Sequence, residues 1–409
     1  MVCHLKSQLN DQELIKLVFR QNPPLASRLK NIIWKYARAV KEREKCDAIK
    51  IMNFCGTHEW TTAYYGLRSL VPPFLELIPG PGCPVCIVPS YYVEVTVKLA
   101  REGMRVYTYG DSLRLRSARS SFPASLLEAR ADGGDVKVVY SFLDAVRDSR
   151  ELGKESVFFG IGFETTAPSY ALMLKDGKVP ENLKFLSVLR LTPPAMEYTI
   201  EHHKERGLPI RGVIAPGHVS TIVGAAEWEF LPKVYGLPTV VAGFEPIDVL
   251  MAIAQILLMI KEGKPAVKIE YKRIVKWNGN EYAKRLIEEV FERASAAWRG
   301  MGFIPRSGLK LKDGFYEKYD ALMHFDLPDL TPERSMFARA HSEVSAEGDL
   351  PPGCRCGEVI IGAARPTECP LFMKGCSPMN PWGPCMVSAE GACAIWARYG
   401  KSKLEARGG

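Results

Sequence analysis

The residues of this 409-residue chain best suited to chemistry are its eleven cysteines, which are clustered. Three stand between residues 55 and 86 and six between Cys354 and Cys393, whereas the long stretch from Cys86 to Cys354 has none inside it. In a reducing compartment, clustered thiols favour metal binding or redox chemistry over structural disulfides. The cysteines are therefore where a prediction of function must begin.

The first motif is Cys55-Gly56-Thr57-His58-Glu59, at the point where an apolar strand-like run ends and a helical pattern begins. Ligands of open α/β folds bind at this edge of the sheet, and a helix N-terminus favours the thiolate form of cysteine. Gly56 permits a sharp turn and the close approach of a partner. His58 could bind a metal or carry a proton, and Glu59 could orient it. The alternative is a buried structural cysteine before a helix-capping threonine.

The second motif is Gly80-Pro81-Gly82-Cys83-Pro84-Val85-Cys86. A Cys-x-x-Cys sequence at a strand-to-helix junction is typical of a redox dithiol or of half a metal site. Its spacing lets both sulfurs reach one metal or form a tight disulfide. The glycines and prolines fix an unusual backbone, which favours a chemical role for Cys83 and Cys86 over a structural one.

The third motif is an array of six cysteines near the C-terminus: Cys354, Cys356, Cys369, Cys376, Cys385 and Cys393. Structural zinc sites usually show paired Cys-x-x-Cys knuckles, and none occurs in this array. Six thiols also exceed the four that one zinc ion or one cubane cluster needs. Four ligands and a spare pair would make an iron–sulfur cluster beside a reducible disulfide. Zinc remains the alternative that the spacing leaves open.

Composition excludes several other classes of function. The chain is 47% apolar and 24% charged, with a net charge of +8 that is spread along it. The basic stretch Lys30–Lys45 is typical of a solvated helix face, and no aromatic-interleaved basic motif indicates nucleic-acid binding. The N-terminus has no apolar signal region, and the longest apolar run, Val249–Ile260, is too short to span a bilayer. We expect a cytoplasmic protein that binds neither nucleic acid nor membrane.

Strand-like and helix-like patterns alternate from residue 49 onward, which predicts an α/β fold with mainly parallel sheets. The expected strands are Ile49–Phe54, Leu75–Ile78, Arg105–Tyr109, Val136–Tyr140, Val157–Phe163, Phe185–Leu191, Gly212–Ala215, Thr239–Phe244 and Val267–Ile274. The clearest expected helices are Tyr91–Glu102, Ala195–Glu205 and Pro246–Glu262.

Short similarities suggest an internal duplication. Two expected strands end in Gly-Phe-Glu, at Gly162 and Gly243, and two others end at Cys55-Gly56-Thr57-His58 and Pro216-Gly217-His218-Val219. We predict two similar parallel-sheet α/β domains, at residues 48–180 and 181–298. N-terminal helices in residues 1–47 should pack with a cysteine-rich iron–sulfur domain at residues 299–409, whose order depends on a metal.

Several motifs together resemble the HypD family of hydrogenase maturation proteins. The resemblance spans residues 53 to about 396. The matching stretches are Asn53-Phe54-Cys55-Gly56-Thr57-His58-Glu59, Pro79-Gly80-Pro81-Gly82-Cys83-Pro84-Val85-Cys86, Gly162-Phe163-Glu164-Thr165-Thr166-Ala167-Pro168, Pro216-Gly217-His218-Val219-Ser220, and the cysteine array with Gly383-Pro384-Cys385-Met386-Val387-Ser388.

The resemblance implies a scaffold and redox assembly factor rather than a conventional enzyme. Its partners would be the chaperone HypC, the cyanide donor HypE and, indirectly, the hydrogenase large subunit. Together they would assemble an iron that carries cyanide and carbon monoxide, the Fe(CN)2CO group. Competing interpretations are an iron–sulfur thiol-disulfide reductase acting on a protein, and a zinc-stabilised scaffold.

The resemblance also implies residue roles. Cys55 would bind the iron, with His58 beside it, and Cys83 and Cys86 would form a redox-active dithiol that can also contact metal. Cys356, Cys369, Cys376 and Cys393 would hold a 4Fe-4S cluster. Cys354 and Cys385 would be the thiol pair next to that cluster.

Overall fold

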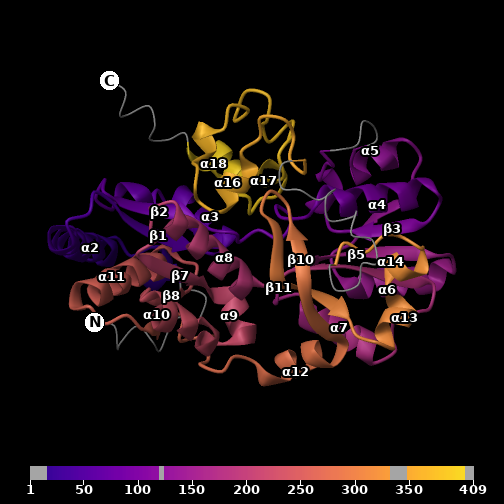
Figure 1. The fold of residues 1–409 in the computed structure, drawn as a ribbon, viewed down its shortest axis with the longest axis horizontal. Helices are drawn as coiled ribbons and strands as arrows, with labels where there is room; N and C mark the ends of the chain where they lie inside the picture. Colours follow the sequence, from indigo (N-terminus) through magenta and orange to yellow (C-terminus); the bar gives the residue numbers. More distant parts are fainter. Residues whose placement is uncertain (1–15, 119–123, 332–347, 401–409) are drawn as a thin grey trace. The chain divides into compact units, whose positions relative to one another are not determined.

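The computed structural model describes residues 16–118, 124–331 and 348–400 (Figure 1). Its contacts divide the chain into two compact units, each built from two separate segments. Unit 1 comprises Met1–Gly80 and His202–Gly279, and unit 2 comprises Pro81–Glu201 and Asn280–Gly409. Both units are α/β and contain a parallel sheet, as the alternating sequence patterns predict.

Unit 1 is built on five parallel strands in the order β2-β1-β7-β8-β9. The strands are β1 (Ile49–Asn53), β2 (Leu75–Pro79), β7 (Gly212–Pro216), β8 (Thr239–Ala242) and β9 (Val267–Ile269). The central strands are almost continuously apolar and buried, as expected of a parallel sheet covered on both faces. Because the strands are parallel, their carboxyl ends lie along one edge of the sheet.

Two long helices pack together in unit 1, α2 (Pro23–Glu44) and α11 (Pro246–Glu262). Helix α2 begins at Asn22, whose side chain accepts a hydrogen bond from the Leu25 amide, and has proline at its first positions. Its apolar stripe, Leu29, Ile33, Ala37 and Val40, is buried in the same core as α11. The buried stripe of α2 packs on α11. The packing of the N-terminal helices with the C-terminal segment stays a prediction. Residues 1–15 of that predicted segment lie outside the described residues.

Shorter helices complete unit 1. They are η2 (Lys16–Arg20), α3 (Gly56–Tyr64), η3 (Leu67–Ser69), α9 (Gly217–Val223), η5 (Ala225–Glu229) and α10 (Phe230–Tyr235). Helix α3 follows β1 and helix α9 follows β7, so that both begin at the carboxyl edge of the sheet.

Unit 2 contains a four-stranded parallel sheet in the order β4-β3-β5-β6. Its strands are β3 (Arg105–Thr108), β4 (Val136–Val138), β5 (Ser156–Gly162) and β6 (Leu183–Leu189). The helices that alternate with them are α4 (Ser90–Arg101), α5 (Leu126–Ala131), α6 (Phe142–Leu152), α7 (Ala167–Lys175) and α8 (Thr192–Glu205), with the short helix η4 (Ser112–Arg114). These elements agree with the predicted strands and helices to within a few residues.

An antiparallel hairpin that the sequence analysis does not predict follows α12 (Glu281–Val290). It consists of β10 (Phe291–Trp298) and β11 (Gly302–Leu311), with an irregularity between Ala294 and Ala296. After it come α13 (Phe315–Tyr319), α14 (Ala321–His324), α16 (Cys356–Ile360), η6 (Pro366–Glu368), α17 (Pro384–Val387) and α18 (Ala392–Tyr399). Helices α16, α17 and α18 contact one another and form the yellow group in Figure 1.

The division of the chain differs from the consecutive domains expected at 48–180 and 181–298. Strands β1 and β2 pair with β7, β8 and β9 in one sheet, and β3 to β6 form the other. The segment expected as a separate cysteine-rich domain, 299–409, belongs to unit 2. Parallel strands are joined by long crossover connections rather than by tight turns. Two strands that are consecutive in the sequence can therefore belong to different sheets.

The suggested duplication is only partly consistent with this topology. The strands that end in Gly-Phe-Glu, β5 and β8, do lie in different sheets, but β1 and β7 are neighbours in the same sheet. Among the described residues, no helix is long and apolar enough to cross a membrane.

Candidate functional site

The carboxyl edge of the unit 1 sheet gathers three of the turns that the sequence singles out. Cys55 directly precedes α3 after β1, Gly217 and His218 begin α9 after β7, and Gly243 follows β8. Since β1, β7 and β8 are adjacent, these turns are neighbours. A Cβ atom on Gly217 would lie 2.4 Å from the Ala242 carbonyl oxygen, so only glycine lets α9 begin this close to the end of β8.

Cys55 occupies the N-cap position of α3 with extended backbone, φ −149° and ψ 129°. Its carbonyl accepts a hydrogen bond from the Glu59 amide, 3.1 Å, and its thiol is half-buried and outside any disulfide. The partial positive charge at the helix N-terminus favours a thiolate at this position. Cys55 therefore has the placement expected of a nucleophilic or metal-binding thiol.

His58 lies in the first turn of α3 and is fully buried. Its Nε2 lies 3.2 Å from the Ala242 carbonyl oxygen and 2.9 Å from that of Gly243. Carbonyl oxygens only accept, so Nε2 carries the proton and Nδ1 holds the lone pair. Burial lowers the pKa of His58 to about 4, against a smaller raising effect of the two carbonyls. Within the described part of the chain, Nδ1 has no hydrogen-bond partner.

Phe244 lies between two histidines. Its ring stacks on His58, with centroids 4.9 Å apart, and on His218, with centroids 4.0 Å apart. Thr61 Oγ1 donates a 2.6 Å hydrogen bond to the Phe244 carbonyl, which ties α3 to this turn. His218 stays exposed at the surface of unit 1, and partial burial lowers its pKa.

The sequence suggests that Glu59 orients His58, but the structure gives Glu59 other partners. Its buried carboxylate accepts hydrogen bonds from Arg68 Nη2 at 2.9 and 2.8 Å, and from Asn53 Nδ2 at 3.2 Å. The carbonyls of Ala242 and Gly243 hold the imidazole of His58 instead. Glu59 thus fixes the start of α3 against β1 and against η3, which carries Arg68.

Two buried acidic residues near Gly243, Glu270 and Asp248, were not predicted from the sequence. The Gly243 amide donates to Glu270 Oε2 at 3.1 Å, and Arg273 binds both carboxylate oxygens of Asp248, one at 3.0 Å. Burial, and then the Asp248 charge, raise the pKa of Glu270 to about 7. One sequence signal could have found Glu270, because it directly follows β9 and therefore lies at the same sheet edge.

Cys83 and Cys86 form a disulfide in unit 2, with Cα atoms 5.4 Å apart. Both residues are buried, and the Cys86 amide donates to Cys83 Sγ at 3.2 Å. Helix α4 begins only at Ser90, so the dithiol lies in the loop before the helix rather than at its first turn. The spacing expectation that these two sulfurs can form a tight disulfide is thus met.

All six C-terminal cysteines line one cavity in unit 2, together with Leu371, Phe372, Gly383 and Met386. Five of the six are buried and Cys354 is half-buried. Neighbouring cysteines in this cavity shift one another's pKa: Cys356 raises that of Cys354, and Cys385 lowers that of Cys393. Residues far apart in sequence are thus gathered around one space by helices α16, α17 and α18.

Backbone amides point at two of these sulfurs. Cys376 Sγ accepts from the amides of Trp382 at 3.3 Å and Gly383 at 3.4 Å, and Cys356 Sγ accepts from the amide of Cys385 at 3.3 Å. Amide donors to sulfur are a means by which proteins stabilise thiolates and tune iron–sulfur clusters. Burial raises the pKa of Cys356 and of Cys376, so metal binding there would release protons.

The donor set consists of cysteine thiols, which are the ligands of iron–sulfur clusters. Within the described residues, no three His, Cys, Asp or Glu side chains are placed to hold one metal ion. A cubane instead bonds each of its four ligand sulfurs to a different iron atom, and all-thiolate coordination is typical of it. Four of the six thiols around this cavity satisfy that requirement in number and kind.

Comparison with known proteins agrees with these motifs. The HypD family model, described as "Hydrogenase formation hypA family", matches residues 30–400. The chain belongs to the HypD family. It is 39% identical over 381 residues to hydrogenase maturation factor HypD2 of Bradyrhizobium diazoefficiens, covering 91% of this chain and 95% of that protein.

Other HypD relatives are similarly close. Hydrogenase maturation factor HypD of Azotobacter vinelandii is 39% identical over 375 residues, 90% of this chain and 93% of that protein. HypD of Cupriavidus necator is 38% identical over 361 residues, 86% of this chain and 90% of that protein. The family resemblance drawn from the sequence motifs is confirmed.

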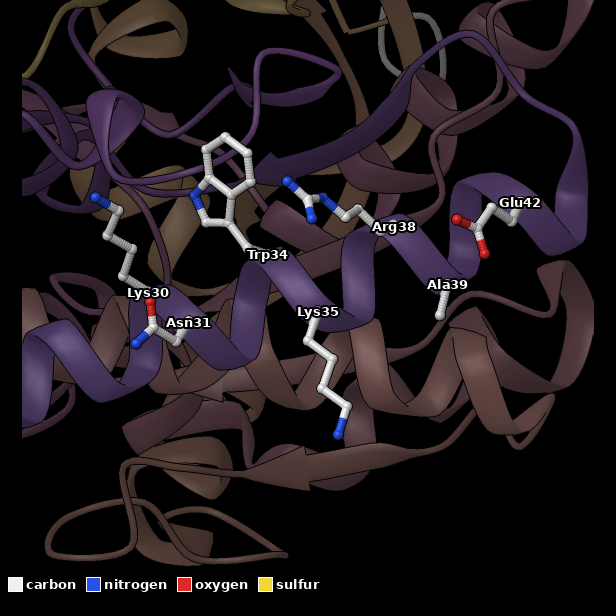
Figure 2. Close-up of a pocket in the computed structure, with 7 residues that line it drawn as sticks. All are labelled: Lys30, Asn31, Trp34, Lys35, Arg38, Ala39 and Glu42. Carbon is white, nitrogen blue, oxygen red and sulfur yellow. The ribbon is translucent and has the colours of Figure 1, made fainter.

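The predicted HypD-type site residues fall into two groups. Cys55 and His58 belong to unit 1, and the Cys83–Cys86 pair and the six C-terminal cysteines belong to unit 2. A separate pocket on α2 contains none of them; Lys30, Asn31, Trp34, Lys35, Arg38, Ala39 and Glu42 line it (Figure 2). There Arg38 lies 5.3 Å from the centroid of the Trp34 ring, in keeping with the solvated basic helix face that the sequence indicates.

Proposed function

We propose that this chain is a hydrogenase maturation factor that assembles the Fe(CN)2CO group with HypC and HypE, and passes it indirectly to the hydrogenase large subunit. The observation that carries the proposal is the gathering of six thiols around one cavity in the unit that also holds the Cys83–Cys86 disulfide. Membership of the HypD family supplies the hydrogenase context. The chain acts as a scaffold and redox protein rather than as a conventional enzyme.

Cys55 is the proposed ligand of the iron under assembly, which is cargo rather than a resident cofactor. Its half-buried thiol at the N-cap of α3 is accessible and favoured as thiolate. Thiolate suits low-spin iron that carries cyanide and carbonyl ligands. His58 supports this site as a neutral imidazole, because its burial keeps it unprotonated at physiological pH.

The C-terminal cavity is the proposed site of a 4Fe-4S cluster, and its contacts support a revised division of the six cysteines. A redox pair needs two sulfurs in contact. The Cys385 amide donates to Cys356 Sγ at 3.3 Å, and both residues are buried. We therefore assign Cys356 and Cys385 as the thiol pair, in place of Cys354 and Cys385. The cluster ligands then become Cys354, Cys369, Cys376 and Cys393.

The residues of unit 2 have separate tasks in this proposal. A cluster bound in the cavity would supply electrons one at a time. The Cys83–Cys86 pair stores two: its disulfide takes up two electrons and two protons to give two thiols. Pro81, Gly82 and Pro84 restrict the backbone of the loop that carries this pair. The amides of Trp382, Gly383 and Cys385 stabilise negative charge on sulfur.

Infrared spectroscopy of the full chain purified with HypC tests the proposal. Cyanide and carbonyl stretching bands are expected, because iron bearing these ligands is the assembled product. The disulfide also favours a second candidate, an iron–sulfur thiol-disulfide reductase acting on a protein. A complex that lacks both bands but reduces protein disulfides with turnover would favour that second function.

A further inference from the structure

The segment between Cys369 and Cys385 has one side in the cysteine cavity of unit 2 and the other side in solvent. The side chains on its inner side line the cavity: Leu371, Phe372 and Cys376. The large apolar side chains on its outer side are exposed: Met373, Met379 and Trp382. These three side chains are named the outer patch, and its most exposed member, Met379, is 89% accessible to solvent.

Cys376 connects the outer patch with the cavity. A turn on its N-terminal side is closed by the Met373 amide, which donates to the Cys376 carbonyl at 2.9 Å. A turn on its C-terminal side is closed by the Asn380 amide, which donates to the Ser377 carbonyl at 3.0 Å. The Trp382 amide then donates to Cys376 Sγ at 3.3 Å. The residues of the outer patch are thus attached on both sides of a proposed cluster ligand.

The backbone at Met373 favours a role for its side chain outside the core. Met373 has φ +56°, in the left-handed region that glycine adopts at lower cost. Its side chain is exposed, so burial does not compensate for that cost. Strained positions of this kind are concentrated where a protein contacts other molecules, and methionine is common on adaptable binding surfaces.

Two cations border the outer patch without a carboxylate partner. Arg114 Nη2 donates to the carbonyls of Pro378 and Met379 at 3.4 and 3.2 Å, which holds the second turn. Lys374 is exposed and directly follows Met373. Within the part of the chain that the structure describes, neither Arg114 nor Lys374 forms an ion pair. Both positive charges therefore remain uncompensated at this surface.

The other charged groups that contact this region are already engaged. The Arg116 guanidinium lies 5.9 Å from the centroid of the Trp382 ring and forms an ion pair with Glu128 at 2.6 Å. The Asp111 carboxylate accepts a hydrogen bond from Ser388 Oγ at 2.8 Å. The border of the outer patch formed by these groups is positive, since three arginine and lysine side chains face two carboxylates.

An apolar patch with a charged border is typical of a site of protein–protein contact. Methionine, tryptophan and arginine are enriched at such interfaces. Encounters between electron-transfer proteins bury little surface and depend on complementary charge for their rate. A positive border favours an acidic partner, because opposite charges steer the two proteins together.

We propose that the outer patch, with Arg114 and Lys374 at its border, docks a small acidic protein that carries a single electron to the cluster. This inference rests on the proposed function, in which each electron that leaves the cluster has to be replaced from outside the chain. In the transfer the carrier loses one electron and the cluster gains one, and no bond forms or breaks. The electron enters on the side of Cys376, the proposed cluster ligand within this segment.

Rapid mixing with plant-type ferredoxin, a small acidic one-electron carrier, tests the proposal. The full-length cluster-loaded chain is mixed anaerobically with reduced ferredoxin and frozen at intervals, and electron paramagnetic resonance follows both reduced clusters. Arg114→Glu combined with Lys374→Glu should lower the second-order rate constant at low salt about tenfold. Met379→Asp should lower it as well. The rate constant of wild type should fall more steeply with added salt than that of the double variant.

Two exposed residues elsewhere in unit 2 provide matched controls. Arg147 is an exposed cation on α6, and Tyr140 is an apolar side chain that is 96% exposed. Arg147→Glu and Tyr140→Asp should keep the wild-type rate constant. Excess dithionite should reduce the cluster completely in every variant, because the outer patch affects docking rather than the cluster. Binding of oxidised ferredoxin, measured by calorimetry, should weaken in the patch variants alone, without any electron transfer.

Several outcomes would overturn the docking proposal. They are a loaded wild type that ferredoxin does not reduce, patch variants with unchanged rate and affinity, and controls that are slowed equally. A wild-type dimer that Met379→Asp converts to monomers would also overturn it, by showing that the patch joins two copies of the chain. A wild-type chain without iron and sulfide would instead overturn the proposed cluster, and this inference with it.

Discussion

At the scale of single residues, one peptide group connects His58 with a pair of buried carboxyl groups. The Ala242 carbonyl accepts from His58 Nε2, and the amide of the same peptide, on Gly243, donates to Glu270 Oε2. Burial, and then the charge of Asp248, raise the pKa of Glu270 to about 7. The arrangement holds His58 in one tautomer, which leaves its Nδ1 lone pair beside the start of α3.

The pKa of His58 makes a testable contribution to stability. Its folded pKa of about 4 lies below the unfolded value of 6.5, so the unfolded chain binds a proton that the folded chain excludes. The contribution of His58 to the free energy of unfolding is complete above pH 6.5. It is lost as the pH falls toward 4, and the loss is on the order of 3 kcal/mol. The thermal midpoint of wild type should therefore fall more steeply than that of His58→Gln between pH 7 and 4.5. Parallel curves would show that His58 is not held neutral.

The revised division of cysteines predicts opposite outcomes for two neighbouring residues. Cys354→Ser should lose most of its iron and sulfide because it removes a proposed cluster ligand. Cys356→Ser should keep near-wild-type iron and sulfide because it removes only one member of the thiol pair. Chemical analysis of anaerobically purified variants measures both. The reverse result would restore Cys356 as ligand and Cys354 as partner of Cys385.

At the scale of elements, the sequence predicted those strands whose apolar runs are bounded by glycine, proline or charged residues. Strands β5 and β6 are of this kind, and every residue in them is buried. The β10–β11 hairpin was missed because the sequence of β10, Phe-Glu-Arg-Ala-Ser-Ala-Ala-Trp, is rich in alanine and continues the composition of α12. Cross-strand packing against β11 overrides that local preference.

The contact between the hairpin turn and α16 gives a prediction at this scale. Gly357→Ala would place a methyl group 2.4 Å from the Gly300 carbonyl oxygen, so α16 must move and carry Cys356 with it. We expect a loss of about 1–3 kcal/mol in stability, as for other overpacked sites, together with weaker cluster retention. Gly110→Ala is the control, because a Cβ atom there has no neighbour within 4 Å. Equal thermal midpoints for the two variants would contradict the tight contact.

At the scale of the whole molecule, sequence order did not indicate which strands share a sheet. The strand before Cys55 pairs with β7, which lies far along the chain, and β7 pairs with β8. These two pairings bring His218 and Phe244 to the same edge as Cys55. Single motifs such as Cys55 and His58 were recognisable because their residue types are unusual. Asp248 and Arg273 were not, because their role depends on long-range packing rather than on local spacing.

Removal of the cluster is expected to loosen the C-terminal part of unit 2 and to leave unit 1 unchanged. Helices α16, α17 and α18 are short and surround the six thiols, so their order should depend on the group they bind. The loaded chain should contain about four irons and four sulfides. Chelation should then increase amide hydrogen exchange in residues 348–400 while leaving α2 and α11 protected. Stoichiometric zinc without sulfide, or unchanged exchange, would contradict this prediction.

The central claim is that Cys55 binds the iron under assembly, and infrared spectroscopy of the Cys55→Ala variant with HypC tests it most directly. Cys55 is in unit 1, whereas the proposed cluster ligands are in unit 2, so the variant should keep its fold, its iron–sulfur content and its binding of HypC. The cyanide and carbonyl bands of the complex should disappear, and hydrogenase maturation should stop. Bands at wild-type intensity in Cys55→Ala would place the iron on other ligands, with Cys83 and Cys86 as the candidates.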